Sequence, residues 1–209
     1  MKSILQSIIT FTLVAVSYGE ENIPFFPTSE RSSDTTISSF EEHWYSKNLT
    51  LMKEESIYRK REQENLEIYR FTLLPTWGEP RSVTISRNRK NLAAIQHSRL
   101  DSEGLFDGKL VEKKKIELKE REFKDFKKLF EATAFSKQTT SDPMLGLDGS
   151  QWILERLKNG DYHIVVRWTA DAYNPEKRGT KEFVDLCNWM LDHAPRTESQ
   201  NQSGDDNSE

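Results

Sequence analysis

The alternation of apolar and polar residues is clearest over residues 148–168, where it predicts a β-hairpin. Two runs rich in β-branched and aromatic residues flank Asn159-Gly160, a dipeptide that tolerates the positive φ angles of a tight two-residue turn. Such a turn fixes which residues share a side of the hairpin. One side is mostly apolar but includes one carboxylate, and along its length it carries Gln151, Ile153, Glu155, Leu157, Tyr162, Ile164, Val166 and Trp168.

Four more segments, all before the hairpin, have the composition of strands. They cover residues 68–74, 82–86, 92–100 and 110–118, and polar residues separate their apolar positions. This alternation predicts an antiparallel meander with one packed face and one face in water.

Three segments have the periodicity of helices. The first covers residues 40–58 and places Phe40, Trp44 and Leu51 near one face; the second covers residues 120–134. The third begins after Thr180, a residue type that caps helices, and stops at Pro195. We therefore expect an α+β fold, in which an antiparallel sheet (a four-strand meander plus a hairpin) carries about three helices on one face.

The N-terminus has the layout of a secretory signal peptide. A basic Met1-Lys2 precedes a largely apolar stretch that ends at Val16, and small residues follow before Glu20. An uncleaved anchor is the alternative, although the stretch is shorter than the roughly 20 residues that span a bilayer. We expect an exported protein, periplasmic or secreted, that meets the membrane only transiently through this peptide.

Composition divides the chain into four parts. They are a signal peptide over residues 1–19, a disordered linker over 20–39, a single α+β domain over 40–195 and a disordered acidic tail over 196–209. The net charge of −4 gives no reason to expect nucleic acid as a partner. Cys187 is the only cysteine, and its place in an apolar helical stripe predicts a buried thiol rather than a reactive or chain-linking one.

Glu155 is out of place on the apolar side of the hairpin, because burying a carboxylate is costly unless it is paired. One interpretation is a structural ion pair with an arginine of another element, for which Arg70 is a candidate. The other is a general acid or base with a raised pKa in a cleft. We favour the ion pair, since no set of catalytic partners accompanies Glu155 in the sequence.

On the other side of the hairpin Trp152 faces Arg167. This pairing allows a cation–π contact, packing of the indole against the aliphatic stem, or a Trp152 that stands clear of the surface to bind a ligand. We favour packing. His163 lies on the same side and is expected at the surface.

The segments DGSQWILE, YHIVVRW and FVDLCNWML resemble an uncharacterised family of bacterial proteins, many of them exported. The segments WYSKNLTLMKEESIY and IYRFTLLPTWGEPRSVTI are similar to its N-terminal part, so the resemblance spans about residues 42–193. The chain departs from the family after Trp168, where a longer polar connection leads to Thr180. The resemblance implies no particular reaction. The matching residues are Asp148, Gly149, Ser150, Trp152, Glu155, Tyr162, His163, Arg167 and Trp168.

The sequence lacks the GxSxG, HExxH, CxxC and P-loop patterns, and its four histidines are far apart. We expect no catalytic set, metal site or cofactor. The favoured function is a non-enzymatic module that binds an unknown protein or small molecule. One alternative is an exported hydrolase that uses Asp148, Glu155 or His163, with at least two of these side chains within hydrogen-bond reach in a deep pocket. The other is a carrier with a large cavity for an apolar ligand. The candidate surface or buried polar network consists of Asp148, Trp152, Glu155, His163, Arg167 and Trp168.

Overall fold

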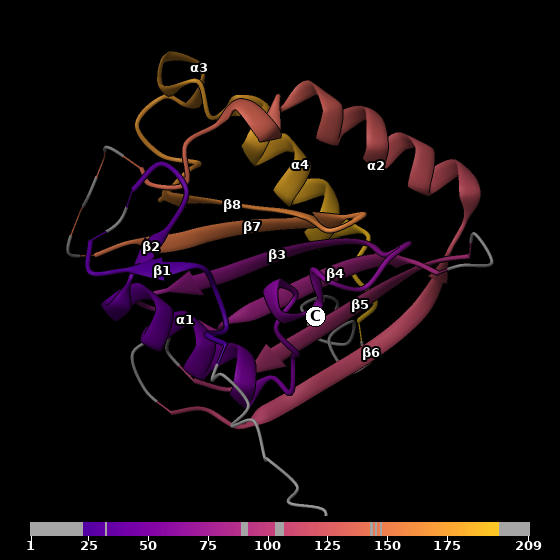
Figure 1. Cartoon of the computed structure of the whole chain (residues 1–209), viewed down its shortest axis with the longest axis horizontal. Helices are drawn as coiled ribbons and strands as arrows, with labels where there is room; N and C mark the ends of the chain where they lie inside the picture. The colour runs from indigo at the N-terminus through magenta and orange to yellow at the C-terminus, as the bar shows by residue number, and fades with distance from the viewer. Residues whose placement is uncertain are drawn as a thin grey trace, which may run out of the picture.

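The computed structural model describes residues 23–31, 33–88, 92–102, 107–142, 144, 146 and 148–196. Its centre is an antiparallel six-stranded sheet with the strand order β6-β5-β4-β3-β7-β8 (Figure 1). The strands are β3 (Glu67–Pro75), β4 (Arg81–Arg87), β5 (Ala93–Leu100), β6 (Leu110–Leu118), β7 (Ser150–Lys158) and β8 (Asp161–Trp168). The four-strand meander and the hairpin are confirmed, and the hairpin joins the meander through β3.

Four α-helices and two 3-10 turns accompany the sheet, which confirms the α+β class. They are α1 (Ser39–Leu51), η1 (Tyr58–Lys60), α2 (Glu120–Ala132), η2 (Phe135–Lys137), α3 (Pro175–Arg178) and α4 (Lys181–Asp192). Two short strands, β1 (Thr28–Ser29) and β2 (Ile37–Ser38), form a separate parallel pair.

The predicted register of the hairpin is confirmed. Asn159 and Gly160 have φ angles of 51° and 83°, as a two-residue turn of this kind requires. Leu157 pairs with Tyr162 and Glu155 pairs with Ile164. The inward and outward sides of β7 and β8 are therefore those that the sequence predicts.

One face of the sheet packs on α2 and α4. The phenylalanines of α2 recur at helical spacing, so Phe123, Phe126 and Phe130 all point to the sheet and are buried. They meet Tyr69 on β3, whose ring lies edge-on to Phe126 at 4.9 Å. Cys187 of α4 lies in the same core, which confirms the buried thiol.

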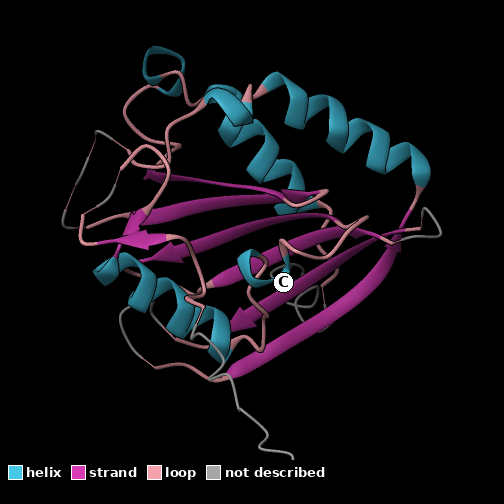
Figure 2. Cartoon of the chain, viewed as in Figure 1, coloured by secondary structure: helices cyan, strands magenta, loops and turns pink. Residues whose placement is uncertain are grey.

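The other face of the sheet is partly covered by a helix, so the prediction that the helices pack on one face only is wrong. At one end of this face α1 lies across the sheet, on the side opposite α2 and α4 (Figure 2). Phe25, Phe26 and Ile37 pack there too, so residues 23–31 and 33–38 belong to the fold and are not the disordered linker predicted over 20–39. The segment is polar on average, so its few apolar side chains did not predict that it would pack on the sheet.

The first helix also differs from its prediction. It ends at Leu51, and Lys53 follows in the left-handed region with φ 55°. Phe40, expected in the packed stripe, is 75% exposed, while Tyr45 and Leu49 are fully buried. The segment carries two overlapping apolar patterns, and the predicted stripe follows the one that does not pack on the sheet.

Beyond α1 the same face of the sheet is polar and open. Thr84, Ser86, Gln96 and Lys115 lie there, and the predicted wet face exists in this half alone. The predicted signal peptide and residues 197–209 of the predicted tail lie outside the described residues. Within the described part, no helix is long and apolar enough to span a membrane.

Candidate functional site

Glu155 forms a buried ion pair with Arg70, as the favoured interpretation predicts. The two residues lie directly opposite each other on β7 and β3, and their side chains are 0% and 1% exposed. Arg70 Nε donates to Glu155 Oε2 at 2.6 Å, and the Tyr162 hydroxyl donates to Oε1 at 2.9 Å. Burial raises the pKa of Glu155, and the Arg70 guanidinium and the Tyr162 hydroxyl oppose this shift.

Arg70 also ties the sheet to the segment that follows α1. Its Nη1 donates to the backbone carbonyl of Glu55 at 2.9 Å. The guanidinium therefore fixes one wall of the open half of the sheet, while Glu155 on the neighbouring strand balances its charge.

Trp152 and Arg167 are paired across the hairpin, but their side chains contact different residues. The indole packs against Phe71 at 5.3 Å between ring centroids, and its Nε1 donates to Ser150 Oγ at 2.9 Å. Arg167 donates to the Val166 carbonyl and to Gln138 Oε1 instead. Trp152 is only 4% exposed, so it packs as favoured, although on Phe71 rather than on the arginine stem.

His163 is half-buried rather than at the open surface. Its ring meets Phe135 edge-on at 5.0 Å, its Nε2 lies 2.9 Å from the Gln138 carbonyl oxygen, and burial lowers its pKa. His163 and Glu155 face opposite sides of the sheet. Asp148 is exposed just before β7, outside the Arg70–Glu155 network. The fold therefore does not assemble the three residues of the hydrolase hypothesis into one site.

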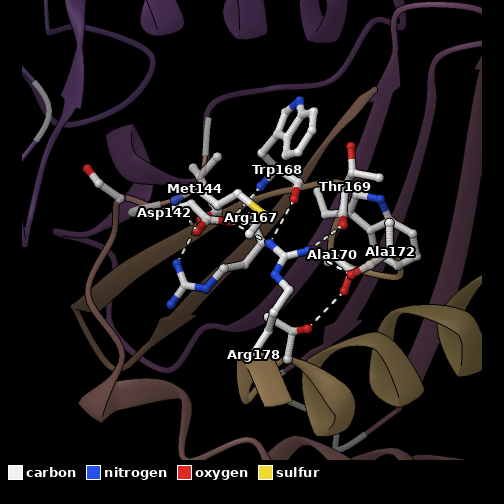
Figure 3. A network of polar contacts seen from close by, with 12 residues as sticks. Asp142, Met144, Arg167, Trp168, Thr169, Ala170, Ala172 and Arg178 are labelled. Carbon is white, nitrogen blue, oxygen red and sulfur yellow. Dashed lines mark hydrogen bonds and ion pairs between the residues drawn. The ribbon is translucent and has the colours of Figure 1, made fainter. Parts of the chain in front are cut away.

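Trp168 belongs to a network of hydrogen bonds that holds the loop after β8 in place (Figure 3). Asp142 Oδ2 accepts from the Trp168 backbone N–H at 2.8 Å and from Arg178 Nη2 at 3.1 Å. Arg178 also donates to the carbonyls of Trp168, Thr169 and Ala172. These groups satisfy one another, so the network is structural. Asp142 and Arg178 could not be predicted from the sequence, because single polar residues in loops carry no periodic signal.

Thr180 does not cap α4 with its side chain, because the loop after β8 occupies its hydroxyl. The Thr180 hydroxyl donates to the Ala170 carbonyl at 2.8 Å and makes no capping bond to α4. Thr180 stands at the predicted position before the helix, but its side chain holds the preceding loop.

The open half of the sheet forms a pocket of about 440 Å³, which we call the sheet pocket. Its volume is in the range of small-molecule sites. The strands supply the floor and residues 53–66 supply a wall. The lining residues are Lys53, Glu54, Glu55, Ile57, Lys60, Leu66, Ile68, Arg70, Thr84, Ser86, Arg87, Asn88, Gln96, Lys113 and Lys115.

Glu54 is the polar centre of one side of the sheet pocket. Its Oε1 accepts from Gln96 Nε2 at 2.8 Å, from Ser98 Oγ at 2.7 Å and from Lys113 Nζ at 3.1 Å. Lys113 Nζ also donates to the Lys53 carbonyl at 2.6 Å. These bonds attach the turn after α1 to β5 and β6, so the pocket wall is fixed.

Positive charge exceeds negative charge in the sheet pocket, although the whole chain has a net charge of −4. Lys113 pairs with Glu54, and Lys60 pairs with Glu55 at 2.5 Å and lowers the pKa of that carboxyl. Arg70 pairs with Glu155, and Arg87 pairs with Glu120. Among the described residues, Lys53 and Lys115 have no ion-pair partner.

A neighbouring pocket of about 570 Å³ lies on the other side of residues 54–60. Its lining combines Glu42, Glu54 and Glu55 with Arg59 and Lys60, and no strand of the sheet contributes to it. The sheet pocket is the better candidate because rigid strands form its floor.

No protein-family model matches this chain, and no curated protein is significantly similar to it. The resemblance to the uncharacterised bacterial family stays a prediction. The described residues contain no group of three histidines, cysteines or carboxylates that could hold a metal ion.

Proposed function

We propose that this protein is a non-enzymatic module that binds a small molecule in the sheet pocket. The observation that carries the proposal is the composition of the site, in which a buried arginine and polar strand residues lie beside the apolar side chains of Ile57, Leu66 and Ile68. Binding sites commonly combine apolar walls with a few polar groups that fix the ligand's orientation.

The lining supports binding rather than catalysis. Among its described residues there is no histidine or cysteine, and its two carboxylates, Glu54 and Glu55, are each paired with a lysine. A general base must be free to accept a proton from the substrate. A carrier of an apolar ligand is less well supported, because the larger pockets lined by described residues open to solvent and carry charged side chains.

The proposal is tested with two fluorescent probes of similar shape, anionic 1-anilinonaphthalene-8-sulfonate and neutral N-phenyl-1-naphthylamine. The full chain is compared with Ser86→Trp, which fills the sheet pocket from β4 without changing charge. We expect at least one probe to bind the full chain and to bind the variant at least about tenfold more weakly, a loss of about 1.4 kcal/mol. Circular dichroism checks that the variant is folded. Binding of neither probe, or binding that Ser86→Trp leaves unchanged, would contradict the proposal.

We further propose that the protein acts after export from a bacterial cell, in the periplasm or outside. The support is the signal-like pattern before Glu20. Expression in a bacterium should give a product that begins at Glu20 and lies outside the cytoplasm, as N-terminal sequencing of each cell fraction would show. An intact Met1 in the cytoplasmic fraction would contradict export.

A further inference from the structure

We infer that the sheet pocket binds a small organic anion, with its acidic group at Lys53, Lys113 and Lys115 and its apolar body against Ile57, Leu66 and Ile68. This inference rests on the proposed function and names its ligand class.

The cationic side of the pocket is assembled from two elements. Lys113 and Lys115 lie two residues apart on β6, so they share a face of the sheet about 7 Å apart along the strand. Lys113 Nζ donates to the Lys53 carbonyl, which brings the turn after α1 to the same place. Because Lys53 and Lys115 lack ion-pair partners among the described residues, an anion here would meet two uncompensated charges.

The conformation of Lys53 adds a second observation. Its φ of 55° lies in the left-handed region, where a residue with a Cβ costs roughly 1–2 kcal/mol more than glycine. A left-handed residue directly after the C-cap is a common way to end a helix, and glycine is the usual residue there. A glycine would end α1 more cheaply, but it would not supply a charge to the pocket.

The floor of the pocket contains a polar atom without a partner. Thr84 Oγ1 is buried from solvent and makes no hydrogen bond with described residues. It lies between Arg70 on β3 and Gln96 on β5, in one row across the sheet. Because this oxygen is closed to solvent, a ligand could bond to it only after the Thr84 side chain rotates. Leaving a buried hydroxyl unbonded costs roughly 1–3 kcal/mol, so that rotation is favourable where the ligand offers a polar group.

The apolar side of the pocket lies across the sheet from the lysines. Ile57 and Ile68 pack with Leu157, and Leu66 covers them. Ile68 is on β3 and Lys115 on β6, three strand spacings away, or about 14 Å. A ligand that reaches both sides has an acidic group at one end and an apolar body of about two fused rings.

The experiment compares the anionic and neutral probes on the full chain and on charge variants. We expect Lys53→Gln and Lys115→Gln each to weaken binding of the anionic probe about three- to fivefold and to leave the neutral probe unchanged. Lys114→Gln is the matched control, because Lys114 is on the same strand but faces the other side of the sheet. Added salt should weaken binding of the anionic probe alone.

The outcomes separate the ligand class from the proposed function. If both probes bind in a way that Ser86→Trp abolishes, but neither responds to Lys53→Gln or Lys115→Gln, the pocket binds ligands and the anion assignment is wrong. The assignment is also wrong if Lys114→Gln weakens the anionic probe as much as Lys115→Gln does. If neither probe binds the full chain, the proposed function itself fails.

Discussion

Arg70 and Glu155 show how one buried charge pair can hold two distant parts of the chain together. Each lies on the side of its strand that faces α1, and neither side chain reaches water. A buried pair gains little over apolar residues of the same size, but either partner alone is an uncompensated charge in the interior. The pair therefore specifies that β7 lies beside β3 in this register.

A double-mutant cycle tests this role. Glu155→Leu should lower the free energy of unfolding by about 3–5 kcal/mol, because it leaves the Arg70 guanidinium buried without its counter-ion. Adding Arg70→Met should recover part of that loss, since no charge is then buried. Urea denaturation of the four proteins measures the coupling. Losses that simply add would show that the two side chains do not depend on each other.

At the scale of single residues, the sequence predicts the unusual buried carboxylate of Glu155 better than it predicts the sheet pocket. Glu155 could be identified because one carboxylate interrupts an apolar alternation, and Arg70 was then a natural partner. The sheet pocket left no such signal. Lys53, Glu54 and Lys113 are ordinary charged residues in the sequence, and they meet only because β6 lies beside the turn after α1.

At the scale of elements, the start of β7 depends on a close approach between two strand ends. Gly149 has a φ of 150°, and a Cβ at this position would collide with the Thr169 hydroxyl and the Trp168 indole nitrogen. The resemblance groups Gly149 and Trp168 in one motif. Their contact gives a physical reason for the pairing, because the indole occupies the space that a side chain would need.

Gly149→Ala should therefore lower the free energy of unfolding by about 2–4 kcal/mol, through backbone strain and overpacking together. Gly179→Ala is the matched control. Gly179 also has a positive φ, 68°, but an added Cβ would meet no atom within 4 Å. The control should lose only about 1 kcal/mol, from backbone strain alone. Equal losses in urea denaturation would show that the collision with Trp168 does not matter.

Strands were predicted more accurately than the first helix, for a physical reason. Alternation along a strand has only two possible faces, and the Asn159-Gly160 turn chooses between them. A helix has more possible faces. In α1 the spacing of Phe40 and Trp44 competes with that of Tyr45 and Leu49, and packing against Phe26 decides the outcome.

At the scale of the whole molecule, the sheet separates two cores that depend on different parts of the chain. One core is built with α2 and α4, whose stripes are evident in the sequence. The other depends on α1 and on Phe25, Phe26 and Ile37. Average composition could not reveal that core, because a few apolar residues in a polar segment are enough to cover a small area of sheet.

The pH dependence of stability is also a property of the whole molecule, since the buried His97 on β5 and the half-buried His163 on β8 lie in different halves of the sheet. Burial lowers the pKa of His97, which lies among Glu112, Arg81 and Arg99, and burial lowers that of His163 as well. A lowered pKa means that the folded state favours the neutral ring. Its contribution to stability is present above the unfolded value of 6.5 and is lost as the pH falls below it.

We expect the free energy of unfolding to fall between about pH 7.5 and about pH 5.5. The fall should be smaller in the double variant His97→Gln/His163→Gln, which keeps polar side chains at both positions but removes their titration. Urea denaturation at the two pH values measures both slopes. An equal fall in the variant would assign the pH dependence to other groups.

The middle position of β3 has a consequence for how the chain is made. Its partner β4 follows directly, but its other partner β7 comes only after β4, β5, β6 and α2. A nascent chain therefore carries one unpaired flank of its central strand until β7, which ends at Lys158, has been synthesised. Such long-range pairing slows folding and leaves a strand open to neighbouring chains. The junction between the meander and the hairpin, at the centre of the sheet, can therefore form only after the whole meander and α2 have been synthesised.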